Sequence, residues 1–238
     1  MVGGRTRAWD DDGFDDAVPF LARLENEDRV ALLSSGRPLR YQARAVLMHQ
    51  AEPSAHVLLV LHGWTKITAT AANGYEALLA LRGPGDILGE GAALSGRGRA
   101  ATVTALEPVE AIVIEQGRFT GFLAANPRVA LQLLSLTTDR QRTTDRRRLQ
   151  WAALTVRERL AVLLLELVRT HGKRTTEGIE LTIGLSQHEF AGSVGSSREA
   201  VARLLTELRA REVVVTRRRH IVVLRPDVLR RIVGEGPA

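Results

Sequence analysis

Apolar residues follow two different periods along this chain. Between Arg40 and Glu115, short apolar runs such as HVLLVLHG, ATVTAL and EAIVIE are separated by Gly, Pro and Asn. Runs of that length between turn residues predict the strands of an all-β barrel or jelly roll. Beyond Pro127 the apolar residues recur at every third or fourth position instead, which predicts one helix of about 25–28 residues. The chain before the strands predicts an acidic tail over residues 1–16, followed by one or two short helices.

The long helix carries one stripe whose ends are apolar and whose middle is polar. At about 1.5 Å per residue the helix extends about 40 Å, and a free helix of that length with a striped face needs a surface to pack against. A second copy of the same helix is the simplest such surface, so we expect residues 126–154 to form a homodimer through this stripe. The stripe comprises Val129, Leu133, Leu136, Arg140, Thr143, Arg147, Trp151 and Leu154.

Three capping boxes divide the last third of the chain, each with a hydroxyl three residues before a carboxylate, which is the pattern of a helix start. The pairs are Thr155 with Glu158, Ser186 with Glu189, and Ser196 with Glu199. The first box marks a domain boundary at residues 154–155. The other two begin short helices joined through Gly195, which is the pattern of a helix-turn-helix. The segment EVVVTRRRHIVVL then predicts a hairpin wing with a basic tip.

Charge and composition narrow the class of protein. The net charge is +6, and residues 155–238 hold 15 Arg or Lys against 10 Asp or Glu, whereas residues 1–154 hold 18 against 17. A basic excess at one end is expected of a segment that binds nucleic acid. The absence of cysteine excludes disulfides, thiol catalysis and iron–sulfur clusters. No apolar run approaches the roughly 20 residues of a membrane span, and no hydrolase or transferase motif appears, so we expect neither a membrane protein nor an enzyme.

The second helix of the predicted helix-turn-helix begins with residues suited to reading DNA. Its first turn meets base edges in the major groove, and we expect Arg198 at its second position. Arginine matches the two acceptors of guanine, and glutamate can accept from cytosine. We expect phosphate contacts from the serines at the helix start and from the arginines of the hairpin tip. The predicted contacts are Ser196, Ser197, Arg198, Glu199, Arg203, Arg217, Arg218 and Arg219.

The segment SQHEFAGSVGSSREAVARLLTEL resembles the helix-turn-helix of the catabolite activator (cyclic-AMP receptor)/FNR family of bacterial transcription regulators, and it matches the core G-x-S-R-E-x-V-x-R in full. The resemblance covers about residues 17–235. It implies base contacts from Arg198, Glu199 and Arg203, and palindromic double-stranded DNA with TGTGA-like half-sites. It also implies a homodimer, RNA polymerase as a further partner, and a location in the bacterial cytoplasm on the nucleoid.

The segment GPGDILGEGAALSGRGRAATVTALE resembles the phosphate-binding cassette of cyclic-nucleotide-binding domains. The resemblance implies that Arg99 binds the phosphate of a cyclic AMP-like effector and that Glu90, after Gly89, accepts from the ribose hydroxyl. The family usually has Ser or Thr after the arginine, but this chain has Ala100, and loss of one neutral donor costs about 1–3 kcal/mol. Thr144 and Asp145 align with the effector contacts of the family's dimer helix.

Alternatives stay open for the effector. The cassette can serve as scaffold in a regulator that needs no nucleotide. Arg140 and Arg147 are either solvated or face a more anionic ligand such as a cyclic dinucleotide. His49, His56 and His62 lie in strand-like stretches, where one could ligate haem in a haem-sensing version of the fold; no covalent cofactor is expected. Outside this class, the chain could be a nucleotide-binding regulatory subunit of an enzyme.

The sequence as a whole predicts an α+β protein with four parts. We expect a flexible acidic tail over residues 1–16 and a cyclic-nucleotide-binding-like β-roll (jelly roll) over residues 17–125. A dimerisation helix follows over residues 126–154, and a C-terminal winged helix-turn-helix domain over residues 155–238.

Overall fold

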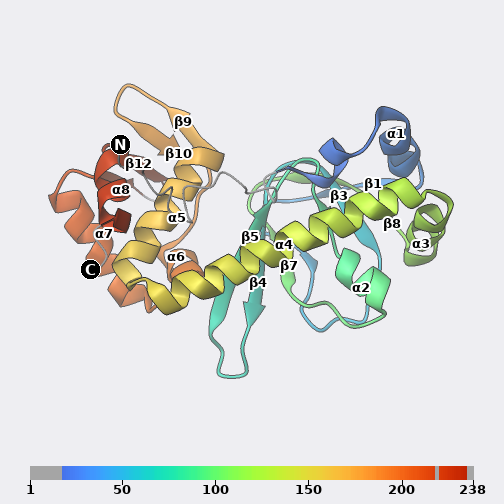
Figure 1. The fold of residues 1–238 in the computed structure, drawn as a ribbon, viewed down its shortest axis with the longest axis horizontal. Helices are drawn as coiled ribbons and strands as arrows, with labels where there is room; N and C mark the ends of the chain where they lie inside the picture. Colours follow the sequence, from blue (N-terminus) through green and yellow to red (C-terminus); the bar gives the residue numbers. More distant parts are fainter. Residues whose placement is uncertain (1–17, 218–219, 235–238) are drawn as a thin grey trace, which may run out of the picture.

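The computed structural model describes residues 18–217 and 220–234, which form two lobes joined by one long helix (Figure 1). The first lobe contains η2 (Phe20–Arg23), α1 (Asn26–Ser34), β1 (Arg37–Tyr41), β2 (Val46–Met48), β3 (Val57–His62), β4 (Thr65–Thr70), β5 (Glu76–Arg82), β6 (Ile87–Leu88), α2 (Glu90–Ser95), β7 (Thr102–Ala105), β8 (Val109–Ile114) and α3 (Gln116–Ala125). The long helix is α4 (Pro127–Ala153). The second lobe contains α5 (Val156–His171), β9 (Gly172–Arg174), β10 (Ile179–Leu181), α6 (Gln187–Val194), α7 (Arg198–Ala210), β11 (Val214–Arg217), β12 (His220–Val223) and α8 (Pro226–Gly234).

The strands of the first lobe form two antiparallel sheets in the orders β1-β8-β3-β6 and β2-β7-β4-β5. Strand β3 is buried on both faces, which explains its uninterrupted apolar sequence. Leu58 and Val60 belong to the core between the sheets, whereas Val57 and Leu59 pack with the helices on the outer side. The predicted β-roll is therefore confirmed, with alternate residues of one strand serving two cores.

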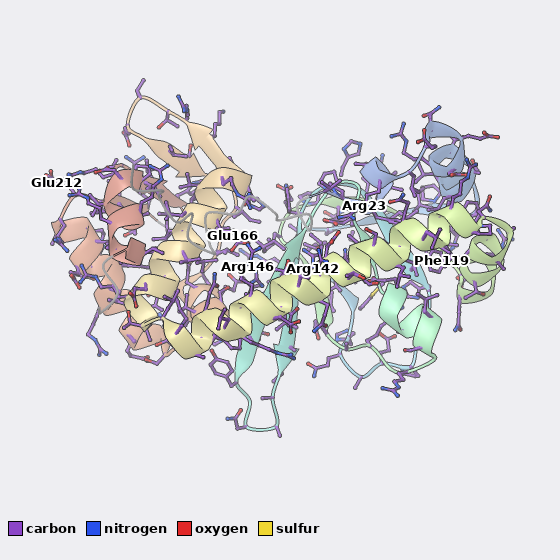
Figure 2. All side chains as sticks on the ribbon, in the orientation of Figure 1. Arg23, Phe119, Arg142, Arg146, Glu166 and Glu212 are labelled. Atoms are coloured by element: carbon purple, nitrogen blue, oxygen red, sulfur yellow. The ribbon has the colours of Figure 1, made fainter. Side chains whose placement is uncertain are left out.

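Helix α4 packs its apolar residues against its own chain. Val129, Leu133 and Leu136 are at most 2% exposed and share a core with Phe20 and Phe119. Figure 2 labels Phe119 beside the end of α4. The first half of the stripe seen in the sequence thus lies on the inward face of the helix, whereas Trp151 in its second half is 45% exposed. The expectation that the residues of this first half contact a second copy is wrong, because the periodicity of a helix reveals a buried face but not what buries it.

The opposite face of α4 carries a second set of apolar side chains. Leu131, Leu134 and Leu149 are 64%, 63% and 59% exposed, and the exposed Gln141 and Asp145 lie between them in sequence. This outward face is apolar near its ends and polar in its middle. Within the described residues no helix is long and apolar enough to cross a membrane.

The described part of the second lobe has four helices and a small sheet around one core. The sheet has the order β11-β12-β10-β9, and α5 packs on α8. The capping boxes at Thr155 and Ser186 are both present. The third box is wrong: Ser197, not Ser196, caps α7 by accepting from the Ala200 amide at 3.2 Å. Two adjacent serines satisfy the same sequence pattern, and the left-handed Gly195 (φ 61°) sets which of them starts the helix.

The two lobes meet where α6 packs on β5. The Gly192 backbone comes so close that an added Cβ would lie 2.7 Å from the Glu76 carbonyl oxygen. The Tyr75 hydroxyl donates to the carbonyl oxygen of Ala191 at 3.4 Å. Leu78 of β5 belongs to the hydrophobic core of the second lobe. The first helix of the helix-turn-helix is therefore seated directly on the β-roll.

A partly buried ion pair fixes the same contact. The Lys66 ammonium on β4 donates to Glu189 Oε1 at 2.7 Å, and Glu189 Oε2 accepts from the Ser186 amide at 2.6 Å. One carboxylate thus caps α6 and attaches it to the β-roll. Burial by itself raises the pKa of Glu189, but the hydrogen bonds from Lys66 and Ser186 outweigh it and hold this pKa below its usual value.

The substitution Glu189→Gln tests the contribution of this carboxylate. Glutamine can still cap α6, but it loses the charge that Lys66 needs, so we expect the free energy of unfolding at pH 7 to fall by about 1–3 kcal/mol. The folded-state pKa is depressed, so this stability is present above the unfolded value of about 4.5 and is lost as pH falls through the folded value. Denaturant unfolding between pH 7 and pH 3 measures both effects.

The matched control is Glu107→Gln, which changes an exposed carboxylate in the turn before β8. We expect the Glu107 variant to unfold like the parent protein, and the gap between the Glu189 variant and the parent to close in acid. A gap that stayed constant down to pH 3 would mean that the effect of Glu189→Gln is steric and not ionic.

Candidate effector pocket and nucleic-acid interface

A cavity of about 280 Å³ lies in the first lobe against α4. It is bounded by the β6–α2 junction, the segment 99–101, strands β4 and β5, and the middle of α4. The cavity brings together most of the residues that the sequence predicts for effector binding: Gly89, Glu90, Arg99, Ala100 and Thr144. Apolar side chains complete the wall, among them Met48, Ile67, Leu88 and Val103.

Arg99 is 3% exposed and is largely engaged by its own chain. Its Nε donates to Ser54 Oγ at 3.1 Å, and its two terminal nitrogens donate to the carbonyl oxygens of Gly89 at 2.9 Å and His56 at 2.7 Å. Three of the five N–H groups of the guanidinium are thus used. Burial lowers the pKa of Arg99, and Glu52 and Glu90 oppose that shift. Arg99 therefore joins three loops as well as facing the cavity.

Gly89 is required by this packing. It adopts φ 82°, and an added Cβ would lie 2.3 Å from Arg99 Nη1. Burial, followed by the charge of Arg99, lowers the pKa of the neighbouring His56 ring. Within the described residues no three His, Cys, Asp or Glu side chains gather as metal ligands.

Glu90 is held by a residue from α4. Arg140 donates to Glu90 Oε1 at 2.5 Å and to the Ile87 carbonyl oxygen at 3.2 Å, and it lies 3.5 Å from Asp86 Oδ1. The side chains of Arg140 and Glu90 are only 17% and 14% exposed. The carboxylate expected to accept from a ribose hydroxyl is thus paired with a guanidinium, and a ligand must compete with that pair.

Arg147 connects the cavity to the second lobe. One terminal nitrogen donates to the carbonyl oxygen of Leu79 on β5, and the other lies 3.5 Å from Glu166 Oε1 on α5. Figure 2 shows Glu166 between the two lobes. Arg140 and Arg147 therefore line the cavity. This position agrees with the interpretation that they face an anionic ligand, and not with the interpretation that they are simply solvated. Arg82 lines the same wall; sequence reasoning missed it, since nothing local distinguishes this arginine at the end of a strand.

The predicted residues on α4 have different positions. Thr144 lines the cavity, with its hydroxyl donating to the Arg140 carbonyl oxygen at 3.0 Å. Asp145 does not line it: it is exposed and pairs with Arg148 at 3.3 Å. Asp145 therefore lies outside the pocket of its own chain, because the next residue on a helix points about 100° away. Its expected effector contact stays a prediction.

The helix-turn-helix exposes its predicted reading residues. Helix α7 buries Val201, Leu205 and Leu208, while Arg198, Glu199 and Arg203 are exposed on its first two turns. Arg198 is the first residue of α7, one position earlier in the helix than expected, because Ser197 is the cap.

The start of α7 presents backbone amides and two serines. The hydroxyl of Ser197 accepts from the helix, whereas Ser196 is half-buried and its amide donates to the Ala191 carbonyl oxygen at 3.1 Å. Hydrogen bonds from its own amide and from Ser197 lower the pKa of the exposed Glu199 carboxyl, so Glu199 is ionised near neutral pH.

The predicted wing is a hairpin of β11 and β12. Arg217 ends β11 and is exposed, with a nitrogen 3.2 Å from Glu177 Oε2. Arg218 and Arg219 lie outside the described residues, so their predicted phosphate contacts stay predictions.

Both lobes match known protein families. Residues 38–126 match the model of the cyclic nucleotide-binding domain, and residues 158–232 match the model of the Crp-like helix-turn-helix domain. The CRP-like cAMP-activated global transcriptional regulator of Mycobacterium tuberculosis is 28% identical over 177 residues, which cover 74% of this chain and 79% of that protein. The cyclic AMP receptor protein of Thermus thermophilus is 29% identical over 196 residues, which cover 82% and 88%.

Solved structures share the fold. The c-di-GMP-responsive global regulator CLP of Xanthomonas campestris superposes with a TM-score of 0.76 at 22% identity, covering 84% of this chain and 99% of that one. A CooA mutant of Carboxydothermus hydrogenoformans gives 0.70 at 22% identity, covering 85% and 90%.

The Arg140–Glu90 pair should discriminate between effectors. In Arg140→Gln the Glu90 carboxylate becomes available, so we expect cyclic AMP to bind more tightly, by about 5-fold. A cyclic dinucleotide carries an additional charge, loses a cation in the same variant, and should bind more weakly. In Ala100→Ser a phosphate donor is restored, and cyclic AMP should again bind about 5-fold more tightly. Titration calorimetry with cyclic AMP and cyclic di-GMP measures all three effects.

The matched control is Arg142→Gln, which removes an exposed cation from the same helix (Figure 2). It should leave both affinities unchanged. Arg99→Ala is a poor probe of phosphate binding, because it also removes three hydrogen bonds that hold loops together. If Arg140→Gln lowered the affinities for cyclic AMP and cyclic di-GMP equally, the Arg140–Glu90 pair would contribute to nucleotide binding and would not compete with it.

Proposed function

Because this chain belongs to the Crp/Fnr family of bacterial transcription regulators, we propose that it works as a homodimer on a palindromic DNA site, under the control of an anionic nucleotide in the β-roll pocket. The chain has a cyclic nucleotide-binding domain and a helix-turn-helix domain, and its relatives are transcription regulators and not enzymes. A nucleotide-binding regulatory subunit of an enzyme would not need the helix-turn-helix, so that alternative is not favoured.

The observation that carries the DNA-binding proposal is the exposure of three charged residues on α7. The apolar face of this helix is anchored in the lobe, so its opposite face is free to enter a major groove. There Arg198 and Arg203 can each bind the two acceptors of a guanine, and Glu199 can accept from a cytosine amino group. These contacts support TGTGA-like half-sites. The start of α7 at Ser196 and Ser197 would bind backbone phosphate.

The wing would add contacts that do not depend on sequence. Arg217 is exposed beside the hairpin tip, and its pairing with Glu177 is a surface ion pair that phosphate can replace. With Arg218 and Arg219 it would form a cluster of cations that binds phosphate. RNA polymerase is proposed as the further partner of the bound dimer, on the strength of the family relationship.

The outward face of α4 is the proposed dimer contact. Its exposed leucines would be buried by the same face of a second copy, in the manner of a coiled coil. Two-fold symmetry would then place the two α7 helices about 34 Å apart, one turn of DNA. Asp145, which points away from the pocket of its own chain, would face the second copy.

Two observations bear on the effector. The cavity of about 280 Å³ is near the lower end of the volumes that hold small-molecule ligands, about 300 Å³, which favours a cyclic AMP-like mononucleotide. Arg82, Arg140 and Arg147 line the same cavity and favour a ligand with more negative charge. A cyclic dinucleotide is therefore the second candidate, and a dimer that binds DNA without any nucleotide is the third, since Arg99 and Glu90 already have partners within the chain.

Replacing Arg198 by Ala should weaken binding to the specific site by about 1–3 kcal/mol and leave nonspecific binding nearly unchanged. The reason is that a base contact contributes only where the correct base is present. Fluorescence anisotropy with a palindromic TGTGA-containing duplex and with a scrambled duplex measures the two affinities.

Two further variants serve as comparisons for Arg198→Ala. Arg209→Ala removes an exposed arginine at the other end of α7 and should change neither affinity. Arg217→Ala should weaken both duplexes alike and reduce the slope of log affinity against log salt by about one unit. If Arg198→Ala weakened both duplexes equally, Arg198 would be a phosphate contact.

Replacing Leu134 by Glu should dissociate the dimer. It places a charge on the outward face of α4, where the two copies would bring two such charges together. Leu94→Glu, which changes a leucine 51% exposed on α2, is the control. Sedimentation at micromolar concentration should give a dimer for the parent and for Leu94→Glu, and a monomer for Leu134→Glu. A monomeric parent protein, with or without DNA, would remove the basis for a palindromic site.

A further inference from the structure

A second and larger cavity, of about 440 Å³, lies between the two lobes. Trp64, strand β5 and the turn that follows β5 form one wall, and the length of α5 from Leu163 to His171 forms the other. The volume lies within the range of roughly 300–1,000 Å³ that holds small-molecule ligands. Among the described residues, the cavity shares only Ala80, Arg82 and Arg147 with the effector pocket, so the two cavities are neighbours separated by a thin wall.

The wall of this interlobe cavity is mainly apolar and includes an aromatic pair. Trp64 and His171 meet edge to face, with ring centroids 4.3 Å apart. Leu78, Leu163 and Leu167 add aliphatic surface. A wall of this composition favours a flat, largely apolar ligand.

His171 carries a buried acceptor without a partner. The Thr170 hydroxyl donates to the Glu166 carbonyl oxygen at 2.8 Å, so its one proton is used, and His171 Nδ1, 2.7 Å from the same hydroxyl, must be the donor to it. Burial lowers the pKa of His171, so the ring is neutral near pH 7 and Nε2 carries no proton. Nε2 is buried and has no hydrogen-bond partner among the described residues, and a ring N–H of a ligand would supply one.

The polar part of the wall favours an anion. It contains three guanidinium groups, from Arg82, Arg147 and Arg169, and two carboxylates. Both carboxylates have partners: Asp86 accepts from the Gly83 amide at 2.9 Å, and Glu166 lies 3.5 Å from Arg147. Guanidinium groups bind carboxylates through paired hydrogen bonds, so a carboxylate on a ligand would compete for these arginines with their present partners.

We propose that the interlobe cavity is a second ligand site, for a small heteroaromatic carboxylate. Its ring lies between Trp64 and the leucines of α5, its ring N–H donates to His171, and its carboxylate pairs with the arginines at the cavity edge. The ligand touches both lobes and the Arg147–Glu166 pair, so it acts on the seating of the helix-turn-helix and, through the shared wall, on the effector pocket.

Three probes of nearly equal shape test the recognition. Indoleacetate has the ring N–H and the charge, naphthaleneacetate lacks the N–H, and indoleacetamide lacks the charge. By calorimetry on the full chain we expect indoleacetate to bind with a Kd below about 1 mM. Naphthaleneacetate should bind about 3–10-fold more weakly, and indoleacetamide at least about 10-fold more weakly. Equal affinity for the three probes, or no binding of any, would overturn the proposal.

Paired variants locate the bound probe. Leu163→Trp fills the interlobe cavity, and Leu165→Trp makes the same change on α5 at a half-buried position that does not line it. Arg169→Gln removes an exposed cation at the cavity edge, and Arg174→Gln removes one outside the cavity. We expect the first variant of each pair to lower the affinity for indoleacetate about 10-fold, and the second variant to leave this affinity unchanged. Equal effects within each pair would count against the site.

A last variant separates the two cavities. Ala100→Phe fills the effector pocket and leaves the interlobe cavity unchanged. The Ala100→Phe protein should therefore bind indoleacetate with the same affinity as the parent protein. Loss of indoleacetate in Ala100→Phe, with binding retained in Leu163→Trp, would assign the probe to the effector pocket and overturn the proposal. The proposed DNA-binding function is judged separately by duplex affinity without any probe, so failure of one does not imply failure of the other.

Discussion

A guanidinium withdrawn from water needs acceptors within the protein, and this requirement organises the centre of the molecule. Arg140 on α4 finds its acceptors in the β6–α2 segment, and Arg147, two turns later, finds them on β5 and α5. Arg99 draws three loops of the β-roll together in the same way. Each of these guanidinium groups must stay paired. Their hydrogen bonds and ion pairs therefore fix α4, the cavity wall and the second lobe relative to one another, in addition to the apolar packing.

The same requirement makes the effector pocket a place of competition. While Arg140 is paired with Glu90, the pocket is satisfied without a ligand, and a nucleotide gains only the difference between its own contacts and those it displaces. A ligand shifts a conformational equilibrium by no more than its differential affinity for the two states. Any control of DNA binding must therefore come from rearranging α4 and its arginines, and the chain has a route for it, since Arg147 touches both the pocket wall and α5.

The sequence contained most of the local structure but little of the long-range pairing. Strand β3, helix α4 and the boxes at Thr155 and Ser186 follow from periodicity and short-range hydrogen bonding, which depend on residues near one another in the chain. The sequence did not show whether the apolar face of α4 is buried by its own chain or by a second copy, because spacing does not reveal what buries a helix. The partners of Arg140 lie in the β6–α2 segment, 50 or more residues away from it along the chain, so no local pattern reveals them. The position of Arg82 beside the same cavity likewise depends on residues distant in sequence. Adjacent serines at 196 and 197 satisfied one motif equally well until Gly195 set the helix start.

Leu78 lies on a strand of the β-roll but packs in the core of the DNA-binding lobe, and Gly192 admits the β5 backbone where any side chain would exclude it. The boundary between the domains in space therefore differs from the boundary in sequence. A chimera that joined this DNA-binding segment to the effector domain of a relative at residue 155 would leave behind one wall of its core. The β4–β5 hairpin would have to travel with the helix-turn-helix for the two halves to fit.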